Sequence, residues 1–204
     1  HTTVSDLSAV DLDVPALAKL DISLEGNSSQ NLFEVNAQNA TVINLSGSVA
    51  GKDEVTVRIN DKDSSKLNEN ILTVNTSDLT GTTGALVFEF DSTAKNTGQD
   101  DTIILSSSSV ISDSIGTLEV VNGHLNATKA ILPNGLAVIT ASGITMTTAQ
   151  FIAADSFTSL PGSGELTIVS DNTIDLAALN TFLTTQDTSG NLANGMTVIG
   201  HDIT

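Results

Sequence analysis

The chain has 204 residues and a mass of 21.0 kDa, which is enough to bury a sizeable hydrophobic core. Its 24 acidic and 7 basic residues give a formal net charge of -17, so nucleic acid and anionic membrane surfaces would repel it. The lack of Cys excludes disulfides and thiolate chemistry, and the lack of Trp and Tyr removes the usual stacking platforms for bases and sugars.

Short apolar and β-branched runs, separated by polar turns, predict strands along the first half of the chain. Between Val55 and Ile59 apolar and polar residues alternate, which predicts a sheet with one face in the core and one in water. The spacing of the runs suits both solenoid turns and hairpins, so an antiparallel β-sandwich in residues 1–115 stays open as an alternative. The predicted strands are Leu20–Leu24, Val42–Leu45, Val55–Ile59, Ile71–Val74, Leu86–Phe90 and Ile103–Leu105.

A sequence repeat is the most informative feature of the C-terminal part. The segment Leu136–Ile144 recurs 30 positions later as Leu166–Ile174, and again as Met196–Ile203. Identical strands joined by a crossover connection run parallel to one another. We therefore expect the apolar residues of the three copies to stack in register on one buried face of a parallel sheet. These residues are Leu136, Val138, Leu166, Ile168, Met196 and Val198.

A short helical pattern follows the first two copies. Thr147 and Gln150 have the spacing of a capping box, and Asp175 stands where an N-cap residue would accept the first free amides of a helix. Each helix is expected to have about two to three turns with one apolar face. The expected apolar faces are Met146, Ala149 and Ile152 in the first copy and Leu176, Leu179 and Phe182 in the second.

The sequence as a whole therefore predicts an all-β, or β-dominated, chain that folds as a parallel β-solenoid with short helices in its C-terminal rungs. Residues 1–115 are expected to form a region of strands only. Residues 116–204 are expected to form strand–helix repeats of 30 residues, truncated inside the third copy.

Two acidic turns are candidates for metal binding. The chain twice reads Gly-x-Asp-acid before a strand, with Asp53 and Glu54 in the first turn and Asp100 and Asp101 in the second. Ca²⁺ takes about six to eight oxygen ligands, and turn carbonyls can complete a set begun by two carboxylates. We hypothesise that these four residues bind Ca²⁺, with solvated turn acids as the alternative.

Catalytic activity is not expected. Parallel β-helices often cleave polysaccharides, but such a site would need aromatic platforms, or cations for an acidic substrate. The chain has no Trp, no Tyr and Arg58 as its single Arg, and no Gly-x-Ser-x-Gly nucleophile motif. We predict no catalytic residues and no organic cofactor.

The segments Leu20–Leu24 and Thr41–Gly47, together with the two acidic turns, resemble the repetitive body of bacterial surface-layer proteins and of RTX-type giant adhesins. This resemblance implies a β-rich, often solenoidal, Ca²⁺-binding protein that is exported by type I secretion and assembles or adheres at the cell surface. The glycine-rich nonapeptide that defines RTX calcium turns is missing, so no ligand position is carried over from that family.

These features together predict a non-enzymatic structural segment of a bacterial cell-surface protein, either surface layer or adhesin, that forms a rigid extracellular scaffold or lattice element. The expected partners are copies of the chain or neighbouring repeats of the same protein, with cell-surface carbohydrate as a further candidate. Nucleic acid binding and membrane insertion are not expected. The alternative function is a carbohydrate-binding or carbohydrate-cleaving β-helix of a phage tail or secreted protein.

Overall fold

The computed structural model describes residues 2–5, 11–13, 19–25, 32–50, 54–59, 69–82, 84–90, 102–140, 143–159, 166–170, 177, 180–181, 184–185 and 196–200. Within these ranges the chain is mostly β-structure, with the short helix α1 (Thr148–Ala153) and further helical residues at 177, 180–181 and 184–185. The strands are β1 (Thr2–Ser5), β2 (Asp11–Asp13), β3 (Lys19–Glu25), β4 (Leu32–Ala37), β5 (Val42–Ala50), β6 (Glu54–Ile59), β7 (Glu69–Thr82), β8 (Gly84–Phe90), β9 (Thr102–Leu105), β10 (Ile115–Val121), β11 (His124–Asn126), β12 (Ala137–Thr140), β13 (Gly143–Thr147), β14 (Ser156–Ser159), β15 (Leu166–Ser170) and β16 (Met196–Gly200).

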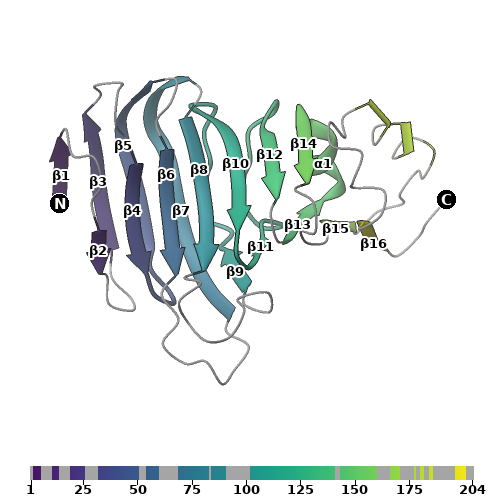
Figure 1. The fold of residues 1–204 in the computed structure, drawn as a ribbon, viewed down its shortest axis with the longest axis horizontal. Helices are drawn as coiled ribbons and strands as arrows, with labels where there is room; N and C mark the ends of the chain where they lie inside the picture. The colour runs from purple at the N-terminus through teal and green to yellow at the C-terminus, as the bar shows by residue number, and fades with distance from the viewer. Residues whose placement is uncertain are drawn as a thin grey trace.

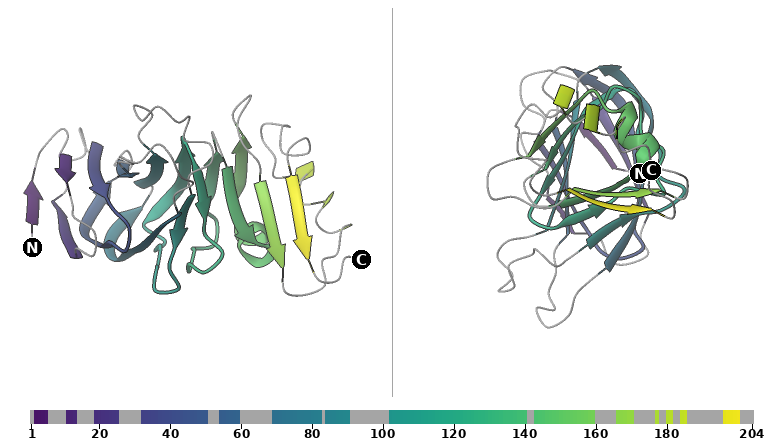
Figure 2. Two further views of the ribbon diagram at one scale, coloured as in Figure 1. Left: turned by 90° about the horizontal axis from the view of Figure 1, so that it is seen from below. Right: turned by 90° about the vertical axis from the view of Figure 1, so that its right-hand side faces the viewer.

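The strands form two sheets in which all pairings between named strands are parallel. The nine-stranded sheet has the order β1-β3-β5-β7-β9-β11-β13-β15-β16, and the seven-stranded sheet has the order β14-β12-β10-β8-β6-β4-β2. Consecutive strands from β1 to β14 therefore alternate between the two sheets. The strands stack along the long axis of the molecule, with β1 at one end and β16 toward the other (Figures 1 and 2).

The predicted β-dominated class is confirmed, and each of the six strands predicted in the first half of the chain is present. The antiparallel sandwich considered for residues 1–115 is wrong, because the strand pairings in this region are parallel. Each strand is followed by one in the opposite sheet rather than by a hairpin partner, which leaves only parallel neighbours within a sheet.

The predicted stacking of the C-terminal repeat is right for the second and third copies and wrong for the first. Leu166 pairs with Met196 and Ile168 with Val198, in the predicted register. In the first copy, Val138 lies in β12, which belongs to the seven-stranded sheet. The position next to β15 is taken by β13, where Ile144 pairs with Leu166. Two strands with similar apolar patterns thus stand where the repeat indicated one.

The capping box of the first predicted helix is confirmed. The Thr147 hydroxyl accepts a hydrogen bond from the Gln150 amide at 3.2 Å, and the Gln150 side-chain oxygen accepts one from the Thr147 amide at 2.9 Å. The predicted apolar face is wrong, because Met146 is buried within β13 while Ile152 is 52% exposed. The helix instead buries Phe151, whose ring centroid lies 4.6 Å from that of Phe157 in β14. The residues that define the second predicted helix, Asp175, Leu176, Leu179 and Phe182, lie outside the described residues.

A single cluster of buried apolar residues extends from Ile22 in β3 to Ile168 in β15 and receives side chains from both sheets. In the seven-stranded sheet, Val57, Phe88 and Val120 occupy one register row, and each is at most 1% exposed. Such a row continues from strand to strand, so the core lies along the stack from β3 to β15. Within the described residues, no helix has the length and apolar character needed to cross a membrane.

Candidate functional site

The outer surface of the seven-stranded sheet gathers charged side chains from four adjacent strands. Side chains alternate across a strand, so residues next to the buried ones point away from the core. On this surface lie Glu34 of β4, Glu54 and Arg58 of β6, Glu89 of β8 and Glu119 of β10. We call these five residues the acidic face.

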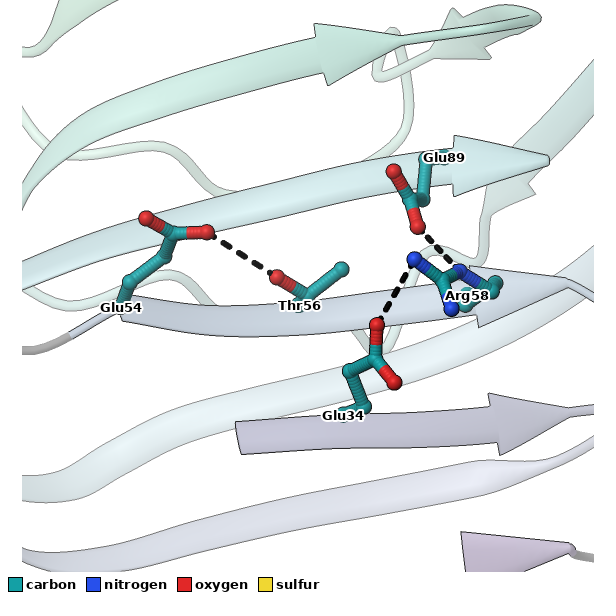
Figure 3. Close-up of polar contacts among 5 residues, drawn as sticks. All are labelled: Glu34, Glu54, Thr56, Arg58 and Glu89. Carbon is teal, nitrogen blue, oxygen red and sulfur yellow. Dashed lines mark hydrogen bonds and ion pairs between the residues drawn. The ribbon is translucent and has the colours of Figure 1, made fainter. Parts of the chain in front are cut away.

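Arg58 ties three neighbouring strands together. Its Nη2 lies 2.7 Å from Oε1 of Glu34, and its Nε donates to Oε1 of Glu89 (Figure 3). Arg58 pairs directly with Glu89 of β8 in the strand register. Glu34 of β4 pairs with Thr56, so the guanidinium reaches Glu34 diagonally from β6 to β4. The Arg58 side chain is 33% exposed, and the side chains of Glu34 and Glu89 are 19% and 14% exposed. These ion pairs are therefore partly buried, and their contribution to stability is expected to lie between those of exposed and fully buried salt bridges.

Glu54 stands at the start of β6. Its Oε1 accepts a hydrogen bond of 3.2 Å from the hydroxyl of Thr56, two residues further along the same strand (Figure 3). The alternation predicted for Val55–Ile59 is confirmed for its apolar residues, which are buried. On the outward side, Thr56 is only 4% exposed, so this face is partly shielded from solvent.

Glu119 takes part in none of the ion pairs found among the described residues. It lies in register between Val87 of β8 and Ile139 of β12, and Val87 is only 4% exposed. Burial among these neighbours raises the pKa of the Glu119 carboxyl, and the negative charges of Glu54 and Glu89 raise it further. The acidic face therefore contains one carboxyl that takes up a proton more readily than an ordinary glutamate.

The structure places one of the four proposed calcium ligands. Glu54 is part of the acidic face, while Asp53, Asp100 and Asp101 lie outside the described residues. The two acidic turns lead into β6 and β9, which belong to different sheets. Among the described residues, no three His, Asp or Glu side chains lie close enough together to hold a metal ion. Calcium binding stays a prediction that melting curves in CaCl₂ and in NaCl of matched ionic strength can test.

Sequence reasoning missed Glu34, Glu89 and Glu119 as members of one cluster. The available signal was a repeated triplet in which a glutamate stands between two apolar residues: Phe33-Glu34-Val35, Phe88-Glu89-Phe90 and Leu118-Glu119-Val120. Within a strand this pattern places the glutamate on the face opposite the core. The triplets do not indicate which strands are neighbours, so the cluster emerges only from the sheet order.

The described surface offers no aromatic platform for a sugar. Phe88, Phe90, Phe151 and Phe157 are all at most 1% exposed, so their rings belong to the core. What the acidic face can do chemically is hold protons and attract cations, because its four carboxylates outnumber its one guanidinium. Comparisons of the chain with protein-family models, with curated proteins and with solved structures find no match.

Proposed function

We propose that this chain is a non-enzymatic scaffold segment of a bacterial cell-surface protein, of the surface-layer or adhesin kind. In this proposal its two parallel sheets are the walls of a β-solenoid with short helices in the C-terminal rungs, and its partners are copies of itself or neighbouring repeats. The observation that carries the proposal is the continuous apolar core between two sheets whose strands alternate along the chain. Such a stack is extended and stiff along its axis, because each rung is held by the rungs on either side.

The composition and the surface support the same proposal. The chain combines a net charge of -17 with many Ser, Thr and Asn residues and no Cys. This composition suits a bacterial surface protein that is kept in solution by its charge and contains no disulfides. A carbohydrate-binding or carbohydrate-cleaving β-helix has less support, because the four described Phe rings are buried and the chain has no Trp or Tyr.

The cellular location is tested by labelling. An antibody against the purified chain is expected to label intact, unpermeabilised bacteria that produce it, and external protease is expected to remove the signal. Labelling that requires permeabilised cells would contradict a surface role. A cytoplasmic protein of the same cell, followed with its own antibody, serves as the control for leakage.

The scaffold architecture is tested by Leu166→Ala in β15. Leu166 is fully buried and pairs with Ile144 on one side and Met196 on the other. Its truncation is expected to cost about 2–5 kcal/mol of unfolding free energy. In a stack held by nearest-neighbour contacts, amide hydrogen exchange should accelerate first in β13 and β16 and least in β3 and β5.

Ile199→Ala is the matched control, because Ile199 lies in β16 but is 54% exposed, so its truncation should change exchange little. Equal acceleration of exchange in all strands after Leu166→Ala would speak for one indivisible globular core and against a stacked scaffold.

A further inference from the structure

The carboxylates of the acidic face divide into two that form ion pairs with Arg58 and two that do not. Arg58 lies against Glu34 and Glu89, which form ion pairs with it. The remaining carboxylates are those of Glu54 and Glu119, and the ion pairs among the described residues do not include either of them. Among the described residues, the guanidinium of Arg58 therefore compensates two of the four carboxylates of the acidic face.

The surroundings of Glu119 favour its neutral form. From β8 it meets the charge of Glu89, and from β6 it meets the charge of Glu54, with Arg58 of the same strand engaged by its own partners. On the other side β12 has the sequence Ala-Val-Ile-Thr and contributes no charged group. Two like charges on one side and an apolar strand on the other penalise an ionised carboxyl.

We propose that the acidic face is a pH-responsive element: protonation of Glu119, which stands in register between Val87 and Ile139, stabilises the sheet at β8, β10 and β12, and its ionisation destabilises the sheet there. This proposal rests on the sheet register and the charge distribution, and it does not depend on the scaffold function.

The direction of the effect follows from proton linkage. Because the pKa of Glu119 is raised in the folded chain, the folded state binds this proton more tightly than the unfolded state does. The resulting stabilisation is complete below the unfolded pKa of about 4.3 and is lost as the pH rises through the higher folded value. Acidification through the raised folded pKa should therefore increase the contribution of Glu119 to the stability.

The test compares the melting temperature of the whole chain at about pH 7.5 and about pH 5 for the natural sequence and for Glu119→Gln. The amide keeps the shape of the side chain and removes its charge. We expect Glu119→Gln to melt at least ~2 °C higher than the natural chain at the neutral pH, and to gain less on acidification. Hydrogen exchange of β10 and β12 should slow on acidification, after correction for the intrinsic pH dependence of exchange, in the natural chain only.

Asp113→Asn is the matched control, because Asp113 is exposed and the substitution removes one negative charge, as Glu119→Gln does. This variant should keep the full gain on acidification, since general charge repulsion is shared by many groups. If Asp113→Asn and Glu119→Gln change the melting profile equally, or if Glu119→Gln melts lower than the natural chain at both pH values, the proposal is overturned.

Discussion

Gly81→Ala is expected to lower the unfolding free energy by about 3–5 kcal/mol, one of the largest effects of any single substitution in this chain. Gly81 has a φ of +99° and lies in β7 opposite Val49 of β5. A Cβ placed there would lie 1.9 Å from the carbonyl oxygen of Val49, which is backbone and cannot turn aside. The loss should appear in urea unfolding followed by circular dichroism.

Gly135→Ala separates backbone strain from steric collision. Gly135 also has a positive φ, +75°, but no atom lies within 4 Å of the position of an added Cβ. Its replacement should cost about 1 kcal/mol, the penalty of the left-handed conformation without the clash. Similar losses in the two variants would mean that β5 and β7 separate easily, which would contradict the close pairing of these strands.

Arg58→Met is expected to cost about 2 kcal/mol at neutral pH. The substitution keeps much of the side-chain length but leaves Glu34 and Glu89 as two partly buried carboxylates without their cation. The cost is smaller than the about 3–5 kcal/mol of a fully buried pair, because a third of the Arg58 side chain is open to solvent. Adding Glu89→Gln should restore part of the loss, since it removes one of the repelling charges. Urea unfolding of the single and double variants measures both effects.

Lys19→Met is the control for an exposed ion pair. Lys19 lies 3.5 Å from Asp21, and the two side chains are 64% and 44% exposed, so solvent screens the pair and this substitution should cost far less than Arg58→Met. Equal effects of Arg58→Met and Lys19→Met would show that the ion pairs of Arg58 with Glu34 and Glu89 stabilise the chain no more than an exposed surface pair does.

The candidate site illustrates what a single sequence can indicate. The sequence indicates Glu54 because it stands beside another acid just before a strand, and the structure places it at the first position of β6. The turn pairs Glu54 with Asp53, whereas in the structure Glu54 shares the acidic face with residues of neighbouring strands. Arg58 reaches Glu89, which is 31 residues further along the chain, and Glu119 lies on the strand beyond that. Local spacing carries no information about contacts of that separation.

The sequence by itself determined the β-dominated class, the positions of six strands in the first half and the alternation that sends their apolar residues to the core, but it missed β1, β2 and β4. These properties depend on side-chain polarity with a period of two, which can be read within a few residues, as in Val55–Ile59. The capping box of α1 is equally local, because its two hydrogen bonds join residues three positions apart.

Only the tertiary structure decided which strands share a sheet. Ala137–Thr140 and Gly143–Thr147 both carry buried apolar residues, and either could pair with Leu166–Ser170 by pattern alone. The choice of Gly143–Thr147 depends on how successive strands alternate between the sheets, and hence on packing across the core. The same register places Arg58 between two glutamates and leaves Glu119 beside an uncharged strand, because a side chain's charged neighbours in a sheet come from adjacent strands that are distant in sequence.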